Sequence, residues 1–271
     1  MSRTIGLVVP AFRPDVDTLL AYVRDLAATL ESVTIRIELD DPRPGTCERL
    51  ADAPATVNAV DRRRGKGAAI TAGFRALETD ADVLAFVDAD GATAVDSVAA
   101  VLEPVLEGEC ELAVGTRRHP DADVVTSQSR LRGRLGDGYA WLARRLLPVS
   151  LTDYQCGAKA ISRDAWVDVR DHLHETGFAW DVELVAVAAT LGHRIVEVPV
   201  TWADAPDSTV SSIGTPPGLA AGLVRTSHRV RRLEGSYVHD WIAKRIPEPR
   251  PVVDTRACTD GRSHDGVDDD E

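Results

Sequence analysis

Short apolar runs alternate with stretches of helical periodicity along the first half of the chain. Apolar runs of strand length occupy residues 5–9, 33–39, 56–60, 83–87 and 111–114, and Pro10 follows the first of them. Apolar residues recur at helical spacing over about residues 15–30, 66–77 and 95–106. Strands that alternate with helices in this way are typical of an α/β domain, in which a mostly parallel sheet has helices on both faces.

The second half of the chain is less regular. Helical spacing covers about residues 127–147, 179–191 and 218–233, and residues 195–198 form a further apolar run of strand length. After Ile246 the chain is Pro-rich, and it is then rich in Gly and Asp up to Glu271. This composition predicts one folded domain over residues 1–246 and a disordered acidic tail over residues 247–271.

The chain is acidic, because 43 Asp and Glu against 31 Lys and Arg give a formal net charge of −12. This balance argues against general nucleic-acid binding, which favours a basic domain, so no nucleic-acid partner is expected. Lys occurs only at positions 66, 159 and 244, and every other base is Arg. An acid surplus with little Lys suits a protein that stays soluble at high salt, and a GC-rich genome would explain it equally well.

The four cysteines and the start of the chain bear on its location. Cysteines stand at positions 47, 110, 156 and 258, with no CxxC pair and no Cys/His zinc spacing. The N-terminus runs directly into an apolar strand without a signal peptide, and no apolar run approaches the ~18 residues of a membrane span. We expect a cytoplasmic protein with reduced thiols that is soluble or, at most, peripheral to a membrane.

The sequence FVDADG, residues 86–91, ends an apolar strand with two carboxylates, Asp88 and Asp90. Two acids beyond the carboxyl end of a strand suit a hard divalent cation that also binds a diphosphate, since Mg²⁺ takes one or two carboxylates together with phosphate oxygens. The alternative is a solvated turn, because Asp and Gly are common after strands.

The sequence RRRGKGA, residues 62–68, is basic and lies at the start of a helix, where free backbone N–H groups favour anions. It is not a P-loop, because the first Gly and the final hydroxyl residue of that motif are missing, and no GxGxxG follows the first strand. The alternative is an ordinary basic turn. Further along, Asp181 and Glu183 begin another helix, and the helix dipole alone would explain two acids there.

Two stretches of the second half are basic and amphipathic. Residues 117–145 carry seven Arg against three Asp, and residues 225–245 carry six bases against two acids, with Leu, Tyr and Trp interleaved. Helices of this kind bind anionic membrane surfaces. We therefore expect peripheral binding at the inner, cytosolic face of the cell membrane. The alternative is a pair of solvated helices that pack on the core.

Six segments follow one another as in a known enzyme family. They are VVPAF (8–12), RGKGAAI (64–70), FVDADGAT (86–93), GTRR (115–118), DYQCGAKAISRDA (153–165) and FAWDVELVAVAATLGHRIVEVPVTW (178–202). On these segments the chain resembles inverting GT-A glycosyltransferases of family 2, in particular dolichyl-phosphate glucosyltransferases, and it is similar to dolichyl-phosphate mannose synthases. The resemblance runs over about residues 5–232. It implies a GT-A fold with a nucleotide-sugar half, about 1–117, and an acceptor half, about 118–246.

The resemblance also implies roles for single residues. Asp88 and Asp90 would hold Mg²⁺ or Mn²⁺, with Asp90 as the more direct ligand. The implied catalytic residues are Asp88, Asp90, Arg117, Gln155 and Asp181. The implied contacts of the nucleotide-sugar are Pro10, Ala11, Asp40, Asp41, Lys66, Asp88, Ala89 and Asp90. The implied contacts of the acceptor phosphate are Arg117, Arg130, Arg132 and Lys159.

Three segments depart from the family pattern. Phe12, Arg13 and Pro14 replace the usual Tyr, Asn and Glu after the first strand, and residues 40–45 replace the usual DDGSxD. Residues 207–209 lack the usual Lys. The first two departures lie in the nucleotide pocket, so the base of the donor stays open.

The expected activity is metal-dependent transfer of a hexose, with inversion, to a polyprenyl (dolichyl) phosphate, in protein N-glycosylation or cell-surface glycan synthesis. UDP-glucose is the expected donor and GDP-mannose is the alternative. A phosphate acceptor is anionic near neutral pH and needs no strong general base. Two further alternatives are a soluble acceptor and a weakened subunit that binds nucleotide-sugar and lipid phosphate beside a membrane protein partner.

Overall fold

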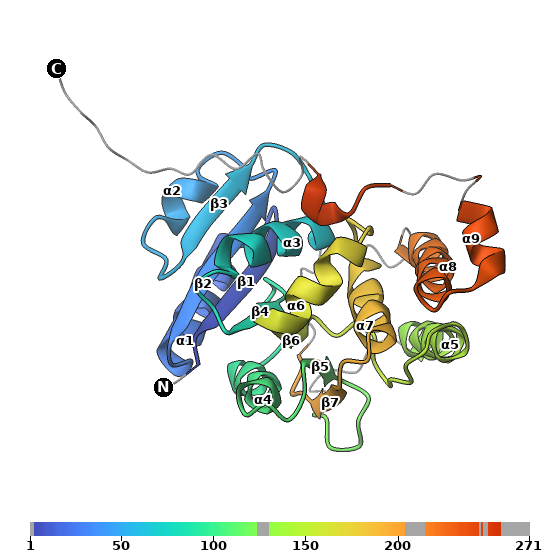
Figure 1. Ribbon diagram of the computed structural model, residues 1–271. Coiled ribbons are helices and arrows are strands. Elements are labelled where there is room, and N and C mark those ends of the chain that lie inside the picture. The colour runs from blue at the N-terminus through green and yellow to red at the C-terminus, as the bar shows by residue number, and fades with distance from the viewer. Residues whose placement is uncertain (1–2, 124–129, 204–214, 244, 246–248, 256–271) are drawn as a thin grey trace.

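The structure is a computed structural model of the 271-residue chain. It describes residues 3–123, 130–203, 215–243, 245 and 249–255. Within two helices, the side chains of residues 130–137 and 215–217 are outside the description. Figure 1 shows a central sheet with helices on both of its faces and a further group of helices to one side.

Seven strands of the described residues form one sheet, in the order β3-β2-β1-β4-β6-β5-β7. They are β1 (Ile5–Phe12), β2 (Val33–Asp40), β3 (Thr56–Val60), β4 (Val83–Val87), β5 (Leu112–Thr116), β6 (Ala158–Ser162) and β7 (Ile195–Pro199). β6 runs antiparallel to both of its neighbours, and every other pair is parallel. The predicted mostly parallel sheet is therefore confirmed, with one reversed strand.

The helices cover the two faces of the sheet. They are α1 (Val16–Thr29), α2 (Thr46–Leu50), α3 (Lys66–Leu77), α4 (Val95–Leu106), α5 (Arg130–Leu146), α6 (Arg163–Val169), α7 (Trp180–Thr190), α8 (Thr215–Leu233) and α9 (Tyr237–Ala243). Apolar side chains of α1 and α4 fill one face, and those of α3, α6 and α7 fill the other. α8 packs against α7, α5 and α9, so these helices extend the second layer to one side (Figure 1).

β6 brings two distant motifs of the sequence together. In the register of β4 with β6, Val87 lies opposite Ala158, and Asp88 donates its N–H to the carbonyl of Gly157 at 2.9 Å. Residues 153–157 therefore lie at the carboxyl edge of the sheet, beside the FVDADG turn. This strand was not predicted, because its five residues, AKAIS, contain one β-branched side chain and a Lys at the second position.

Most predicted boundaries in the first half are confirmed, and α3, α4, β3 and β4 agree to the residue. The first strand, predicted to end before Pro10, continues to Phe12. β4 pairs only with residues 5–8 of β1, so Pro10 has a neighbouring strand on one side only, where a missing N–H is tolerated. The helices α2, α6 and α9 and the strand β6 were not predicted.

The predicted disordered tail is wrong for residues 249–255. Val252 and Val253 form a short 3₁₀ helix, η2 (Val252–Asp254), and both side chains are buried. The N–H of Val252 donates to the carbonyl of Leu173 at 2.7 Å, and Arg75 of α3 donates to the carbonyl of Val253 at 2.5 Å. Two adjacent valines thus give this Pro-rich stretch an apolar anchor. Residues 256–271 lie outside the described part of the chain.

No helix in the described ranges is both long enough and apolar enough to cross a membrane.

Replacing Val252 by Ala should lower the free energy of unfolding by roughly 1–3 kcal/mol, because it leaves a cavity where a fully buried side chain packs. Urea unfolding followed by circular dichroism measures the change. Val167→Ala is the matched control, since Val167 is 43% exposed and its truncation should change stability by less than about 0.5 kcal/mol. Equally small effects of the two substitutions would contradict the packing of this segment.

Candidate active site

Four charged side chains form a continuous series of ion pairs at the carboxyl edge of the sheet. The Nζ of Lys66 lies 2.8 Å from Oδ1 of Asp88 and 3.1 Å from Oδ2 of Asp181. The Nζ of Lys159 lies 3.0 Å from Oδ1 of Asp181 and donates to the carbonyl of Cys156 at 2.7 Å. We call Asp88, Lys66, Asp181 and Lys159 the charge ladder. The last two residues of this series are almost fully buried, since Asp181 is 2% exposed and Lys159 is 1% exposed.

Four different elements supply the charge ladder. Asp88 follows β4, Lys66 is the first residue of α3, Asp181 lies in the first turn of α7, and Lys159 lies in β6. The centre of the Phe86 ring is 5.1 Å from the Nζ of Lys66 and 5.6 Å from that of Lys159. Because the face of an aromatic ring attracts cations, Phe86 supports both ammonium groups.

The ladder keeps Lys66 and Asp181 charged. Burial lowers the pKa of Lys66, but the carboxylates of Asp181 and Asp88 outweigh burial and raise it. Burial raises the pKa of Asp181, but the ammonium groups of Lys159 and Lys66 outweigh burial and bring it below its ordinary value. Asp181 is therefore a weak base whose two oxygens each hold a lysine.

Asp90 is the second acid of the turn after β4. Its Oδ1 accepts the N–H of Ala92 at 3.0 Å. Burial, together with the negative charge of Asp88, raises the pKa of Asp90. A bound divalent cation would favour the ionised form of both carboxylates, which are ligands of the kind that Mg²⁺ and Mn²⁺ take. Among the residues described, no group of three or more His, Cys, Asp or Glu is placed to hold a metal ion.

Asp40 fixes the basic loop before α3. Its Oδ2 accepts the N–H of Arg64 at 2.7 Å and that of Gly65 at 3.0 Å, and its Oδ1 accepts from Nε of Arg64 at 2.7 Å. Arg64 also lies 2.8 Å from Oε2 of Glu38. Both oxygens of Asp40 are thus engaged within the protein, and its contact with a nucleotide stays a prediction.

The two departing segments at the nucleotide edge contact each other. The Nη2 of Arg13 lies 2.7 Å from Oδ2 of Asp41, and both residues have positive φ, at 46° and 47°. The guanidinium carbon of Arg63 lies 4.3 Å from the centre of the Phe12 ring. The unusual residues after β1 and β2 are therefore matched to each other in this chain.

Asp153 holds Arg117 at the end of β5. The Nε of Arg117 donates to Oδ2 of Asp153 at 2.7 Å, and its Nη2 donates to Oδ1 at 3.0 Å. Glu197 accepts the N–H of Asp153 at 3.1 Å. Burial raises the pKa of Asp153, but the Arg117 guanidinium outweighs burial and lowers it. The Arg117 side chain stays 23% exposed, so part of it is accessible to a ligand.

The remaining predicted site residues have different outcomes. Pro10 and Ala11 lie in β1, Ala89 lies between the two acids of the turn, and Gln155 is half-buried two residues after Asp153. Arg130 and Arg132 begin α5, and their side chains are outside the described residues, so their contact with the acceptor phosphate stays a prediction. The predicted contact of Lys159 with that phosphate finds no support, because its ammonium is buried between Asp181 and Cys156.

Sequence reasoning missed residues that position the site. Arg64 looks like its neighbours in a run of three Arg, and Asp153 stands in a motif from which other residues were chosen. Tyr139 of α5 was noted only as one of the residues interleaved in the amphipathic stretch 117–145. Its hydroxyl is buried without a hydrogen-bond partner in the described part of the chain, and burial, followed by the charge of Asp181, raises its pKa. Only the fold brings Arg64 to Asp40, Asp153 to Arg117, and Tyr139 within range of the charge of Asp181.

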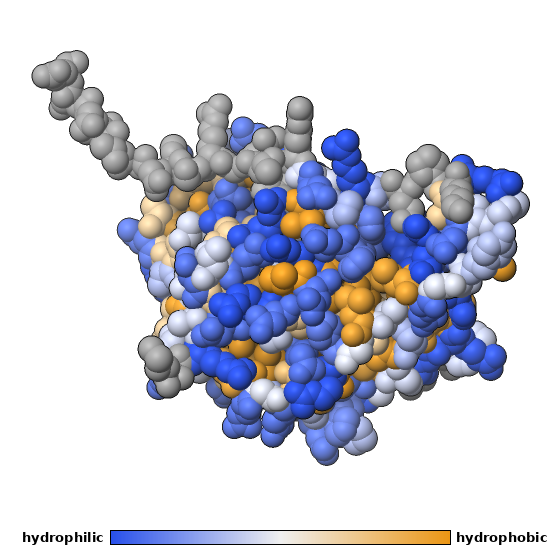
Figure 2. All heavy atoms as spheres, in the orientation of Figure 1, coloured by the Kyte–Doolittle hydropathy of each residue, from blue (hydrophilic) through white to orange (hydrophobic). Residues whose placement is uncertain are grey.

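Helices α5 and α9 expose aromatic side chains beside arginines. Trp141 and Trp241 are each about half exposed, and Tyr237 is more exposed still. The guanidinium carbon of Arg145 lies 5.1 Å from the centre of the Trp141 ring, and that of Arg245 lies 3.5 Å from the Trp241 ring. Figure 2 shows polar and charged residues over most of the visible face, with smaller apolar areas between them.

Two of the six bases counted in residues 225–245 are paired with a buried acid of the protein, although only one of the two is itself buried. Arg225 and Arg229 of α8 donate to Glu175 at 2.7 Å and 3.0 Å, and Arg229 is almost fully buried. The positive charge that this stretch presents to a surface is therefore smaller than the sequence count.

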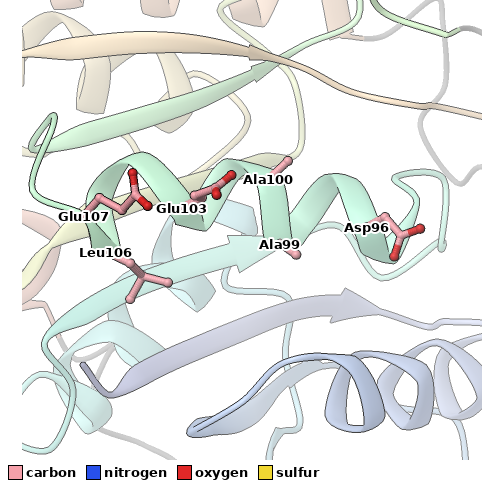
Figure 3. A pocket seen from close by; sticks show the side chains of 6 residues that line it. All are labelled: Asp96, Ala99, Ala100, Glu103, Leu106 and Glu107. Atoms are coloured by element: carbon pink, nitrogen blue, oxygen red, sulfur yellow. The ribbon is translucent and has the colours of Figure 1, made fainter. Parts of the chain in front are cut away.

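A shallow pocket lies on α4, away from the ladder. Figure 3 shows its lining along that one helix and its C-terminal cap: Asp96, Ala99, Ala100, Glu103, Leu106 and Glu107. The lining includes none of the predicted site residues.

Replacing Asp153 by Asn should lower the free energy of unfolding at pH 7 by roughly 1.5–3 kcal/mol, because a buried charge-assisted hydrogen bond is lost. The folded pKa of Asp153 lies below 3.8, so its ion pair contributes full stability above that pH and loses it as the pH falls through the folded pKa. Urea midpoints between pH 3 and 7 should show wild type and variant converging at low pH. Parallel curves would contradict the ion pair.

Comparison with known proteins gives the family. The model of glycosyl transferase family 2 matches residues 7–169. Glycosyltransferase AglD of Haloferax volcanii is 31% identical over 233 residues, which are 82% of this chain and 36% of AglD. The dolichyl-phosphate beta-glucosyltransferase of Mus musculus is 27% identical over 75% of this chain and 68% of its own. The undecaprenyl-phosphate mannosyltransferase of Micrococcus luteus is 32% identical over 61% of this chain and 70% of its own. The chain thus spans about a third of AglD and about two thirds of the other two.

Solved structures give the fold. Glucosyl-3-phosphoglycerate synthase of Mycobacterium tuberculosis, in complex with Mn²⁺, UDP and its product, superposes with a TM-score of 0.63 at 19% identity, over 83% of this chain and 80% of its own. Mannosyl-3-phosphoglycerate synthase of Rubrobacter xylanophilus superposes with a TM-score of 0.63 at 20% identity, over 86% of this chain and 75% of its own. The predicted GT-A fold is therefore confirmed. Because the family model matches more than half of the chain, the protein belongs to glycosyl transferase family 2.

Proposed function

We propose that this protein transfers a hexose from a nucleoside-diphosphate sugar to the phosphate of a polyprenyl lipid such as dolichyl phosphate. The observation that carries the proposal is the charge ladder, in which Lys66 is held between Asp88 and the buried Asp181. It sets a fixed positive charge beside two acids suited to a metal ion, as a diphosphate leaving group requires. The names of the mouse and Micrococcus luteus relatives support a lipid-phosphate acceptor.

The reaction is a single in-line displacement with inversion. An acceptor-phosphate oxygen bonds to the anomeric carbon while the bond from that carbon to the diphosphate breaks. When bound at Asp88 and Asp90, Mg²⁺ or Mn²⁺ would neutralise charge on the leaving diphosphate. Lys66 contributes a second positive charge beside the diphosphate. The ion pair with Asp181 orients the Lys66 ammonium. Arg117, held by Asp153, is the residue we assign to the acceptor phosphate.

The ion pairs of Asp181 favour a phosphate over a hydroxyl acceptor. A hydroxyl acceptor needs a general base with a pKa near the working pH. Although burial raises the pKa of Asp181, Lys159 and Lys66 bring it below the ordinary value, so Asp181 is a poor base. A phosphate is anionic near neutral pH and needs no base.

The donor is proposed as UDP-glucose, on the resemblance to dolichyl-phosphate glucosyltransferases. GDP-mannose is the second donor to test, since one relative is named a mannosyltransferase.

A specific observation favours a second candidate function. Asp40 is engaged by Arg64, and Asp41 by Arg13, so both predicted nucleotide contacts are used inside the protein. A weakened subunit that binds nucleotide-sugar and lipid phosphate beside a membrane protein partner would account for this.

A lipid-phosphate acceptor supports a position at a membrane surface, and we propose the cytosolic face of the cell membrane. Trp141 with Arg145, and Trp241 with Arg245, each join an exposed ring to a guanidinium. Tryptophan suits the boundary between lipid and water, because its ring is apolar and its N–H is polar, and arginine suits anionic headgroups. We propose α5 and α9 as the surfaces that bind the membrane peripherally.

Replacing Asp90 by Ala should reduce transfer by on the order of 10²–10³-fold, because a ligand of the ion that stabilises the leaving group is lost. Purified protein is incubated with Mn²⁺, vesicles containing dolichyl phosphate, and radiolabelled UDP-glucose or GDP-mannose, and the label in the lipid phase is counted. Glu103→Ala, which removes a surface carboxylate of α4, is the control. Undiminished activity of Asp90→Ala would exclude the metal role. No lipid-phase label from either donor, at low and at high salt, would refute the transferase.

Replacing both Trp141 and Trp241 by Ala should weaken binding to anionic vesicles by tenfold or more. Each ring would bury on the order of 100 Å² of apolar surface at about 25 cal/mol per Å². Flotation with phosphatidylglycerol vesicles measures the change. The double variant Val167→Ala with Leu191→Ala removes exposed apolar side chains from α6 and the end of α7 and should float like the wild type. Equal flotation of all three proteins would count against these helices.

A further inference from the structure

One backbone segment lies between the start of α3 and α8. We call residues 174–180, which precede and begin α7, the linking segment. The carbonyl of Thr176 accepts the N–H of Ala68 at 3.1 Å. A Cβ on Gly65 would lie 2.5 Å from that carbonyl oxygen, and a Cβ on Gly67 would lie 2.5 Å from the Cβ of Trp180. The first turn of α3, which begins with Lys66, therefore contacts the linking segment with no room for a side chain between them.

α8 holds the linking segment from its other side. The Nε and Nη2 of Arg225 each donate to one carboxylate oxygen of Glu175, both at 2.7 Å. The Nη1 of Arg229 lies 3.0 Å from Oε1 of Glu175 and 2.5 Å from Oε1 of Glu183. Two arginines of one helix thus fix Glu175, which is one residue before the carbonyl that contacts α3.

Glu183 holds the same segment from within α7. Its Oε2 accepts the N–H groups of His174 and Glu175, both at 2.7 Å, and its side chain is fully buried. Glu183 and Asp181 are two residues apart, about 200° around the helix. One acid therefore faces the lysines of the charge ladder, and the other faces the linking segment and α8.

We propose that Glu175 and Arg229 are positioning residues for Lys66, which set where its ammonium stands relative to the diphosphate of the donor. They do so by holding the linking segment against the first turn of α3. The inference rests on the proposed function, because it takes a donor diphosphate as the ligand of Lys66. It adds a role in donor binding for an arginine of α8, a helix that supplies none of the predicted nucleotide contacts.

Ion pairs suit this role better than apolar packing does. Burying ions carries a desolvation penalty, and well-packed apolar residues of similar volume are often equally stabilising. The ion pairs of Glu175 fix the orientation of its carboxylate, because the two nitrogens of an arginine fork match a carboxylate in one geometry. Direction matters here, since a misplacement of about 1 Å in an active site can cost about 10²-fold in rate.

Glu175→Gln keeps the size of the side chain and removes the charge that both arginines require. The Kd of UDP or GDP in the presence of Mn²⁺, measured by calorimetry on the full chain, should rise roughly tenfold. The donor KM should rise by a similar factor, while the KM of dolichyl phosphate stays unchanged. If Glu175→Gln does not fold, Arg225→Lys, which keeps the charge and loses the two-nitrogen fork to Glu175, should raise the same Kd.

Glu78→Gln is the matched control. Glu78 pairs with Arg170 at 2.5 Å and accepts from Trp166 at 2.7 Å just beyond the opposite end of α3. Its loss should lower stability without changing the nucleotide Kd. In addition, Glu175→Gln should have little further effect on that Kd once Lys66 is replaced by Met, because it acts through Lys66.

The outcomes separate the two proposals. Wild type that binds neither nucleotide would refute the proposed function, and this inference with it. Wild type that binds a nucleotide, together with an unchanged Kd in Glu175→Gln, would overturn the positioning role alone. An equal rise in Glu78→Gln, or a full additional rise in the Lys66→Met background, would do the same.

Discussion

The arrangement of the carboxyl edge depends on one constraint, namely that two buried ammonium groups must be neutralised by carboxylates from other elements. Lys66 and Lys159 share Asp181, and Lys66 also contacts Asp88. Removing one partner would leave an uncompensated buried charge, which is strongly destabilising. The ends of β4, β6, α3 and α7 are therefore fixed relative to one another. Asp90 is the acid that this balance leaves in excess, and it stands beside the place where the donor diphosphate is proposed to bind.

The ladder also needs backbones that approach closely. A Cβ at Gly157 would lie 1.9 Å from Oδ2 of Asp88, so only glycine lets the 153–157 loop meet the turn after β4. Gly67 has the same function between α3 and Trp180. In the sequence, Gly67 appeared as part of a basic, anion-binding motif. In the structure its direct role is steric, since it brings Lys66 to the start of α7.

Helices and strands with a regular apolar pattern could be predicted from the sequence. Which charged side chains pair with each other could not. The helices α3 and α4 and the strands β3 and β4 follow from strong local periodicity. Asp88, Asp90, Lys66 and Asp181 follow from motifs. The missing parts are the pairings, such as Lys159 with Asp181, Arg117 with Asp153, and Arg229 with Glu175. A count of bases along residues 225–245 cannot tell an arginine that faces solvent from one that faces a buried Glu, because both occur on the same amphipathic helix. β6 was missed for a related reason, as its burial comes from its neighbours rather than from its composition.

In a chain that uses Arg almost everywhere, the Lys at position 66 has a physical explanation. Arg is the default base of this chain, and two of its arginines bind a carboxylate with two nitrogens of the planar guanidinium, at Asp153 and at Glu175. Lys66 instead has to reach two carboxylates from different elements while lying over the face of Phe86. A compact ammonium with three rotatable donors can do this, whereas a guanidinium has its donors fixed in one plane. An Arg at position 66 would keep the charge and lose the geometry, so the residue type at this position follows from the shape of the site rather than from its charge alone.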